Sequence, residues 1–396
     1  MRIPNYYSGI ILFMFVVADS ACSHKHIQTD SSSMSTMVTV FKGARIIDGS
    51  GNSALENANL VIEGDHILAI QASTVPIPDD AQILDMRGKT IMPTLIDAHS
   101  HLLQTEHEVS LQLQKFTQYG VGAVASHDSD LDFIYALRKR RLLHELQVPL
   151  MLTAGHGLKL PGLKNLKEVK KVLREIIELK PDFVEIDLRD PEHSPSTHPD
   201  PNLAQEIVKE AHAANLKVAA SIFYLEDAKQ LASAQVDFFV HSIRDQKVDQ
   251  ELIKLMKKNH VAYIPTLSLE EREPSNPAAQ KQLKLAKENV RRLFQAGIAI
   301  GLGTSSDRDQ ATVDGFAEHR EIELLVSTGM APLQAIKSAT LISANILGIN
   351  GDYGMLQAGR KASLIVLNNN PLEDITNTLS IQSVWIDGVQ KFVASP

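Results

Sequence analysis

The chain carries two kinds of hydrophobic pattern. Near both ends, short apolar runs alternate with Gly and Pro turn signals, which is typical of β-strands. The predicted terminal strands are residues 38–41, 59–63, 66–70, 81–85, 363–367 and 383–386, the last followed by a turn at Asp387 and Gly388. The pattern therefore predicts a small composite β-sandwich domain that both termini build, from residues 38–90 and 355–396.

The middle of the chain, residues 91–354, alternates apolar strand patterns with helical ones. Eight strands are predicted at residues 90–96, 121–125, 149–153, 183–186, 217–222, 237–240, 262–265 and 299–302. Helical patterns fall between them at residues 166–178, 203–214, 227–234, 250–258 and 280–296. Strands that are each followed by a helix predict an α/β fold, a (β/α)8 TIM-type barrel. An open doubly wound sheet is the alternative, but no Gly-rich phosphate turn follows any strand.

The first residues differ from the rest. Arg2 precedes the apolar run 9–18, which has the length of a signal-peptide core and is too short to span a membrane. Cys22, the only cysteine, follows that run, so residues 1–22 are predicted to be a signal peptide of lipoprotein type, although Asp19 stands where such signals carry an aliphatic residue. Ordinary cleavage, for example after Ser23, is the alternative. Residues 23–37 are predicted to be a solvated tether, and the chain is expected to be exported to the periplasm or bacterial envelope.

Composition narrows the possible functions. A net charge of −8 gives no basic footprint for nucleic acid, and no Lys/Arg cluster is found that tracks a nucleic-acid backbone. The single Trp385 and the low aromatic content offer no base-stacking platform. One cysteine excludes an intramolecular disulfide, cysteine clusters and cysteine catalysis in the barrel. Membrane attachment is expected only through a lipidated Cys22. A small-molecule enzyme or binding protein fits these limits.

The strongest chemical signal lies at the end of the first predicted barrel strand. His99 and His101 are separated by one residue on an extended segment, so both imidazoles point the same way and can converge on one ion. In a parallel barrel, chemistry belongs at the carboxyl ends of the strands, which is where this pair falls. The pair therefore predicts a divalent metal site.

Several segments resemble those of the amidohydrolase superfamily, especially its imidazolonepropionase-like and prolidase-like members. The resemblance is carried by IMPTLIDAHSHL, YGVGAV, VEIDLRD, FFVHSIRD, YIPTL, LGTSSD and the C-terminal TGMAPLQAIKSATLISANILGI and GMLQAGRKASLIVL. It extends from about residue 38 to the end of the chain. It implies a metal-dependent hydrolase fold in which the first strand supplies the His-x-His pair, here His99 and His101.

The same resemblance implies further ligands on the fourth, fifth, sixth and eighth strands. His241 matches the sixth-strand His, and Glu185 occupies the fourth-strand position, where a carboxylate can replace the carboxylated Lys that the family often uses. Ser221 stands at the fifth-strand His position and Ser305 at the eighth-strand Asp position. The expected metal set is therefore His99, His101, Glu185 and His241, holding one or two divalent ions, zinc being favoured.

Other residues are candidates for the remaining roles. Serine is a poor base near neutral pH, so Asp307, two residues beyond Ser305, is the candidate for the catalytic carboxylate. His156, after the third strand, and Arg244, after His241, are candidates for substrate binding.

These residues predict hydrolysis of carbon–nitrogen bonds in small amide, cyclic-amide or dipeptide-like substrates by metal-activated water. The altered positions leave an alternative from another class: a catalytically impaired pseudoenzyme that keeps the fold and acts as a binding protein.

Overall fold

The structure, a computed structural model, places most of the chain after the first strand. It describes residues 38–103, 105–127, 132–142, 148–155, 157–159, 165–188, 200–271, 275–306 and 315–395. The predicted signal peptide, Cys22 and the tether lie outside the described residues. Residues 36–396 belong to one compact unit.

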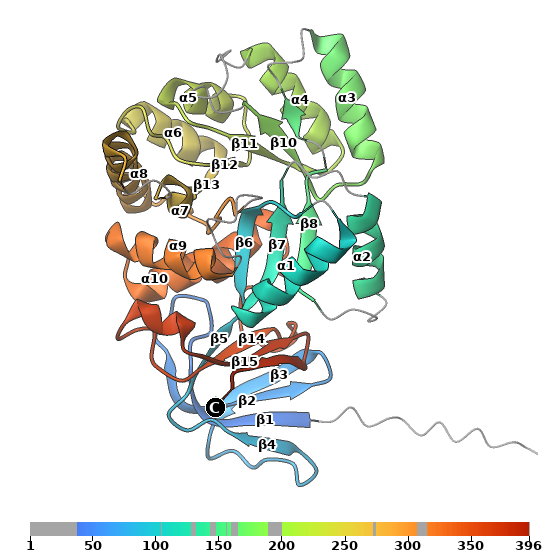
Figure 1. Cartoon of the computed structure of the whole chain (residues 1–396), viewed down its shortest axis with the longest axis vertical. Helices are drawn as coiled ribbons and strands as arrows, with labels where there is room; N and C mark the ends of the chain where they lie inside the picture. The colour runs from blue at the N-terminus through green and yellow to red at the C-terminus, as the bar shows by residue number, and fades with distance from the viewer. Residues whose placement is uncertain are drawn as a thin grey trace, which may run out of the picture. The chain divides into compact units, whose positions relative to one another are not determined.

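Both ends of the chain contribute strands to a single eight-stranded sheet, ordered β16-β15-β14-β5-β1-β2-β3 with β4 beside β1 (Figure 1). These strands are β1 (Val38–Ile46), β2 (Leu55–Glu63), β3 (His66–Ala72), β4 (Gln82–Asp85), β5 (Thr90–Pro93), β14 (Leu364–Leu367), β15 (Ile381–Ile386) and β16 (Val389–Val393). The antiparallel pair β5–β14 joins the N-terminal strands to the C-terminal ones. Hydrogen bonds thus connect all these strands in one sheet, and the predicted two-layer sandwich is not confirmed.

The predicted strand 90–96 is two strands. Thr90–Pro93 pairs with β1 and β14 in the terminal sheet, whereas β6 (Leu95–Ser100) pairs with β7 (Val121–Ser126) among the parallel strands. Thr94, between them, donates its N–H to the carbonyl of Ser363. Pro93 has no N–H to continue a ladder on both sides, which suits the change of partner here. The terminal sheet therefore extends to Pro93, past the predicted boundary at residue 90.

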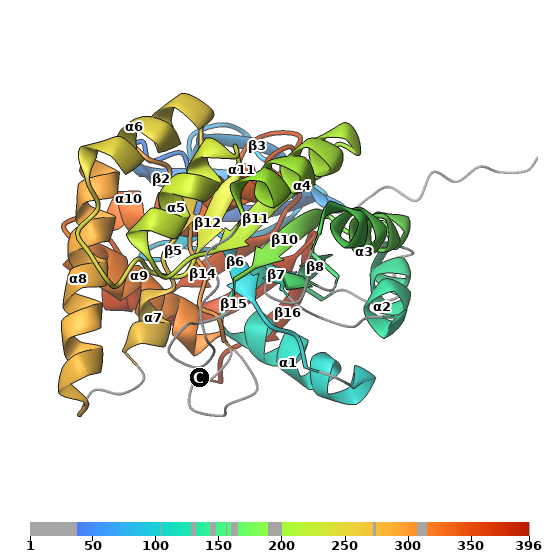
Figure 2. The ribbon, with the colours of Figure 1, turned by 90° about the horizontal axis from the view of Figure 1, so that it is seen from above.

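The parallel strands form two hydrogen-bonded groups. One group is β6-β7-β8 and the other is β13-β12-β11-β10-β9. Beyond β6 and β7, the members are β8 (Leu150–Thr153), β9 (Leu158–Lys159), β10 (Phe183–Asp187), β11 (Lys217–Ser221), β12 (Phe238–Val240) and β13 (Ala262–Ile264). Figure 2 shows helices arranged around these strands.

The predicted eighth strand joins the two groups on one side. The N–H of Tyr263 in β13 donates to the carbonyl of Ala299, and the N–H of Ala98 in β6 donates to Leu302. On the other side, the N–H of Asp182 donates to Thr153 in β8. The fold is thus α/β with parallel strands, and the closed eight-stranded barrel stays a prediction.

The helices begin where the sequence supplies caps. Thr105 and Glu108 form a reciprocal capping box at α1, and Asn165, Asp200 and Asn276 cap α3, α4 and α8. The first helices are α1 (Glu106–Gln118), α2 (Asp132–Leu142), α3 (Leu166–Glu178), α4 (Pro201–Ala213), α5 (Leu225–Ser233) and α6 (Gln250–Asn259). After them come α7 (Leu267–Glu270), α8 (Pro277–Gln295), α9 (Phe316–Ser327), α10 (Pro332–Lys337), η2 (Ser338–Ile342), α11 (Ser343–Leu347) and η3 (Ile375–Leu379).

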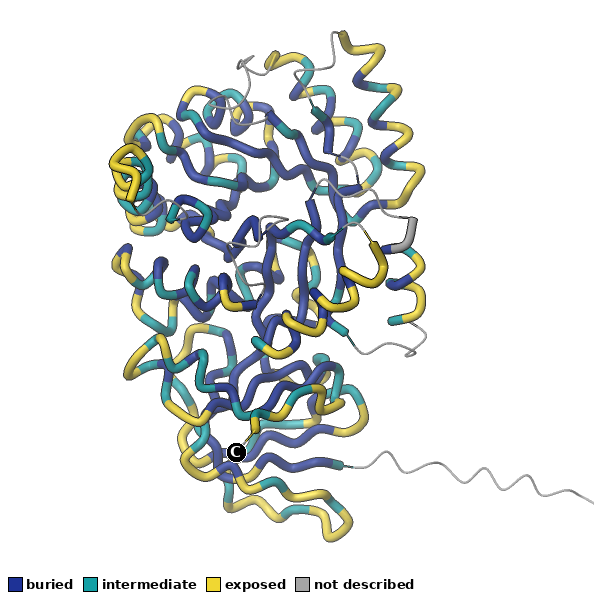
Figure 3. The backbone as a smooth tube through the Cα atoms, viewed as in Figure 1, coloured by how far each residue is buried: buried dark blue, intermediate teal, exposed yellow. Residues whose placement is uncertain are grey.

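The core lies between strands and helices. All residues of β6 and β7 are buried, and the tube in Figure 3 is buried along the parallel strands and exposed on the outer helix faces. Among the helices of the described residues, none is both long and apolar enough to span a bilayer.

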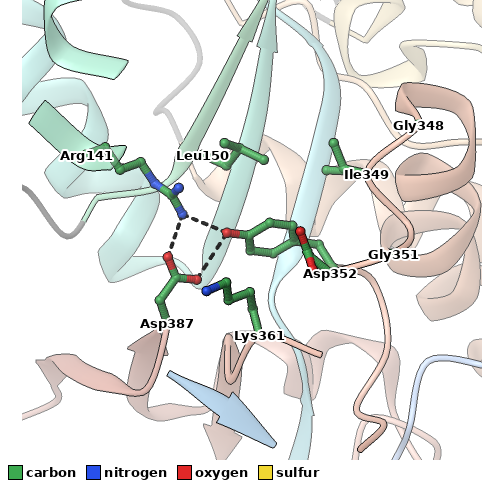
Figure 4. Close-up of a pocket in the computed structure, with 9 residues that line it drawn as sticks. Arg141, Leu150, Gly348, Ile349, Gly351, Asp352, Lys361 and Asp387 are labelled. Atoms are coloured by element: carbon green, nitrogen blue, oxygen red, sulfur yellow. Dashed lines mark hydrogen bonds and ion pairs between the residues drawn. The ribbon is translucent and has the colours of Figure 1, made fainter. Parts of the chain in front are cut away.

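A polar cluster ties the terminal sheet to the helical layer. Arg141 at the end of α2 donates to the Tyr353 hydroxyl at 2.9 Å and to Asp387 Oδ2 at 2.8 Å, and Tyr353 contacts Asp387 Oδ1 at 3.2 Å. These side chains and Lys361 line a cavity of about 400 Å³ (Figure 4). Because the Arg141 and Asp387 side chains are only 9% and 15% exposed, water compensates either charge poorly once its partner is lost.

We expect Arg141→Met to lower the free energy of unfolding by about 3 kcal/mol, because it leaves Asp387 without its buried cation. Urea unfolding would measure the loss. Arg140→Met is the matched control, since Arg140 pairs with Glu106 at the surface, and it should cost less than about 1 kcal/mol. Equal losses in the two variants would refute a stabilising role for the cluster.

Candidate metal centre

The carboxyl ends of neighbouring parallel strands bring a set of polar side chains together. His99 lies near the end of β6, His127 directly follows β7, Glu185 lies in β10, and His241 directly follows β12. His99, His127 and Glu185 are all buried, with at most 3% of their surface exposed. Buried polar side chains need hydrogen-bond or metal partners. We therefore take this group of residues as the candidate site.

His99 occupies the centre of the histidine group. The centroid of its ring lies 4.1 Å from that of His127, 4.6 Å from that of His241 and 5.3 Å from that of His101. Both ring nitrogens of His99 are buried, and neither makes a hydrogen bond within the described part of the chain. Burial, together with electrostatic repulsion from the other imidazoles, holds the pKa of His99 well below its usual value. The ring is therefore neutral near pH 7 and has a lone pair to offer.

Glu185 is the only acidic member of this group. Its Oε1 lies 3.1 Å from the Ser221 hydroxyl, which donates to it, and 3.2 Å from His127 Nδ1. Its Oε2 is buried and makes no hydrogen bond with any described residue. Burial alone would raise the pKa of Glu185, but attraction to His127 and the neighbouring imidazoles outweighs it and holds the pKa at about 2. The carboxylate is therefore ionised at neutral pH.

Hydrogen bonds fix the orientation of the other imidazoles. His101 Nδ1 lies 2.7 Å from the carbonyl of His127, and His127 Nε2 lies 3.1 Å from the carbonyl of Ala98. Because a carbonyl only accepts, each of these nitrogens carries a proton. His241 Nδ1 lies 3.3 Å from the Thr266 hydroxyl, and burial lowers the pKa of His241 to about 3 despite the nearby Glu185 carboxylate.

These donors suit a divalent cation. His99, His127 and Glu185 each offer a ligand atom, and the three atoms lie within 4.8 Å of one another. Neutral imidazole nitrogens and an ionised carboxylate are the ligands that zinc and similar ions prefer. The atoms of His99 and Glu185 that lack hydrogen bonds are those that a cation would satisfy. The residues present therefore fit a metal ion.

The first strand is anchored to the eighth. Asp97 accepts the N–H of His99 at 3.0 Å and the hydroxyl of Thr304 at 2.7 Å. In return, the carbonyl of His99 accepts the N–H groups of Thr304 and Ser305 at 3.0 and 2.7 Å. Burial raises the pKa of Asp97. These bonds hold the backbone that carries His99 against residues 304–305.

Backbone strain collects at the strand ends beside the site. His241, Thr266 and Ser305 have φ of 72°, 47° and 50°, a left-handed conformation that costs residues other than Gly roughly 1 kcal/mol or more each. They directly follow or lie close to the ends of β12, β13 and the predicted eighth strand. Residues with positive φ angles therefore cluster at the strand ends beside the histidines.

Arg244 lies beside this group rather than inside it. Its guanidinium carbon is 4.8 Å from the ring centroid of Phe223, whose ring stacks on His241 at 5.1 Å. Arg244 Nη1 also lies 3.7 Å from Glu270 Oε2, and both side chains are largely buried. The structure thus places Arg244 one aromatic ring away from the histidines.

The structure brings the four predicted ligands, His99, His101, Glu185 and His241, into one region, but their roles stay predictions. Ser221 contacts the carboxylate of Glu185, and Ser305 bonds the His99 carbonyl through its own backbone. The candidates His156 and Asp307 lie outside the described residues.

Sequence reasoning missed His127. It directly follows the run VGAVAS of the second predicted strand, so a search for histidines after strand ends would have found it.

The comparisons with known proteins identify the class. A model of the amidohydrolase family matches residues 90–391, and the chain belongs to this family. Imidazolonepropionase of Deinococcus deserti is 23% identical over 375 residues, covering 85% of this chain and 92% of the relative. The 5'-deoxyadenosine deaminase of Methanothermobacter thermautotrophicus is 21% identical over 384 residues, covering 82% and 83%.

Solved structures show the same fold. A Xaa-Pro dipeptidase with bound methionine in its active site matches with a TM-score of 0.80 and 21% identity, covering 90% of this chain and all of that one. The chain is thus a member of a hydrolase family whose named relatives here act on small molecules.

Gly303 provides a test of the packing behind the site. A Cβ at this position would lie 2.5 Å from Ile264 Cγ2 and 2.8 Å from His99 Cβ. We expect Gly303→Ala to cost about 1–3 kcal/mol of stability and to weaken zinc binding about tenfold or more, because it displaces His99. Urea unfolding and competition with a chromophoric chelator measure the two effects. Gly351→Ala, whose Cβ meets nothing within 4 Å, is the control and should change neither. Unaltered zinc affinity in Gly303→Ala would contradict the assignment.

Proposed function

We propose that the protein is a metal-dependent hydrolase that cleaves carbon–nitrogen bonds in small amide, cyclic-amide or dipeptide-like substrates. The observation that carries the proposal is the buried pair His99 and Glu185 in a chain of the amidohydrolase family. Both ring nitrogens of His99 and Oε2 of Glu185 make no hydrogen bond with any described residue. An orphaned imidazole beside an ionised carboxylate is costly unless a cation satisfies both.

His99 and Glu185 would hold the metal, with His101 and His241 as the other predicted ligands. When bound, zinc in this site would polarise a carbonyl oxygen and make water nucleophilic near neutral pH. Glu185 supplies the negative charge that a divalent cation requires, and the Ser221 hydroxyl fixes the direction of that carboxylate. We favour one ion, because Ser221 replaces an imidazole in the set implied by the family resemblance.

The remaining roles follow from position. Asp307 is the proposed base and lies immediately beyond Ser306 in the sequence. Arg244 is the proposed contact for an anionic substrate group, since its guanidinium and the His241 ring both pack against the Phe223 ring. His156, which follows the third predicted strand in the sequence, is a second proposed substrate contact. A closed eight-stranded barrel is the architecture we propose around these residues, in line with the solved dipeptidase.

The alternative is a pseudoenzyme that keeps the fold and binds a ligand. Ser221 and Ser305, in place of an imidazole and a carboxylate, favour it. The relatives named above carry enzyme names, and they lend this alternative no support.

Elemental analysis and activity assays on the protein purified without chelator test the proposal. We expect about one divalent ion per chain and turnover of Xaa-Pro dipeptides or cyclic amides. Chelation and the His99→Asn/His101→Asn double variant should remove the ion and lower kcat/KM at least about 100-fold. His212→Asn is the control, because His212 is exposed and pairs with Asp237. Failure of the unaltered protein to bind zinc, cobalt or manganese would favour the pseudoenzyme.

We further propose export to the bacterial envelope, with Cys22 as the lipid-attachment site. The support is the order of Arg2, the apolar run 9–18 and Cys22 in the sequence. Cells fed labelled palmitate should yield labelled protein, and Cys22→Ser should abolish the label. Unlabelled wild-type protein in the envelope would show export without lipidation.

A further inference from the structure

We propose that His127, directly after the second barrel strand (β7), is a direct metal ligand and takes the place that Ser221 leaves at the fifth strand. The inference rests on the proposed metal-dependent function. It gives a ligand set of His99, His127 and Glu185, and it moves the ion toward β6, β7 and β10. The ligand set expected from the sequence contains no residue from the end of β7.

The first argument is convergence. Among the described residues, only these three side chains place ligand atoms within 4.8 Å of one another. The His99 and His127 rings approach to 4.1 Å between centroids, closer than His99 approaches His101 or His241. Metal bonds of about 2 Å bring ligand atoms within roughly 3–3.5 Å of one another, so a small contraction completes the site.

The second argument is the orientation of the His127 ring. Its Nε2 faces the carbonyl of Ala98 at 3.1 Å, between Asp97 and His99 on the strand that carries the His-x-His pair. Ligating histidines commonly donate their other ring N–H to a carbonyl, which fixes the tautomer and aims the lone pair. Here that arrangement leaves Nδ1 as the lone-pair atom, directed toward Glu185.

The third argument is the contact between Nδ1 and Glu185. Nδ1 lies 3.2 Å from Oε1, the distance of an ion pair when Nδ1 also carries a proton. In the neutral ring with its proton on Nε2, Nδ1 has a lone pair directed toward the carboxylate. A divalent cation that binds Nδ1 and Glu185 would take the place of the second ring proton.

The fourth argument concerns Ser221. Its hydroxyl donates to Oε1 of Glu185 at 3.1 Å, so it acts on the carboxylate rather than on an ion. A neutral hydroxyl is a weak ligand compared with imidazole. Ser221 at the end of β11 thus offers no imidazole ligand, and His127, directly after β7, offers one instead.

Cobalt titration of the full chain tests the assignment, because the visible spectrum of Co²⁺ reports its ligands without any substrate. We expect His127→Asn to bind Co²⁺ at least about tenfold more weakly than the unaltered protein. His212→Asn, a surface histidine, should bind as the unaltered protein does. Wild-type affinity in His127→Asn would overturn the proposal.

A second variant tests whether His127 binds the ion itself or only positions Glu185. In a Cys22→Ser background, His127→Cys introduces the only thiol, and direct coordination should add a cobalt–thiolate charge-transfer band in the near ultraviolet. Weaker binding in His127→Asn without that band in His127→Cys would mean that His127 only positions Glu185, which also overturns the proposal.

A third measurement needs no variant. An anomalous difference map of cobalt-soaked crystals should place the ion within about 2.3 Å of His127 Nδ1, and an ion beyond roughly 3 Å would refute ligation. Absence of any bound ion in the unaltered protein would instead reject the proposed function. The two failures are therefore distinguishable.

Discussion

An ionised carboxylate buried among parallel strands is the constraint on which this site depends. Water cannot compensate Glu185, so its charge must be balanced by neighbouring groups. The Ser221 hydroxyl donates to the carboxylate and His127 Nδ1 lies 3.2 Å from it, and a bound cation would supply the balancing charge. His241 and Thr266, which follow β12 and β13, have positive φ angles beside this site.

Most of the fold was predictable because its elements carry strong local patterns. The helical periodicity at 166–178 matches α3 (Leu166–Glu178). The helix predicted at 280–296 begins three residues earlier, at Pro277, after the cap Asn276. The run 90–96 was read as one strand, since both of its halves are apolar and only pairing with β14 distinguishes them. Long-range partners of this kind leave no trace in local hydrophobicity.

The sequence predicts which site residues converge when they lie close together along the chain, and does not predict it when they lie far apart. His99 and His101 are separated by one residue, so their convergence follows from strand geometry. His127 and Ser221 gain their meaning only through contacts with Glu185 from two different strands. The family resemblance implies ligands on the first, fourth, fifth, sixth and eighth strands. It implies none at the second strand, which His127 follows. Spatial contact, rather than spacing, identified it.

The pairing of β5 with β14 has a consequence for the biogenesis of the chain. Strands β1 to β5 expose an open edge until the ribosome has made the residues beyond 364, so the N-terminal sheet has no complete partner for most of synthesis. The sheet is thus completed only after the C-terminal strands β14 to β16 have been made.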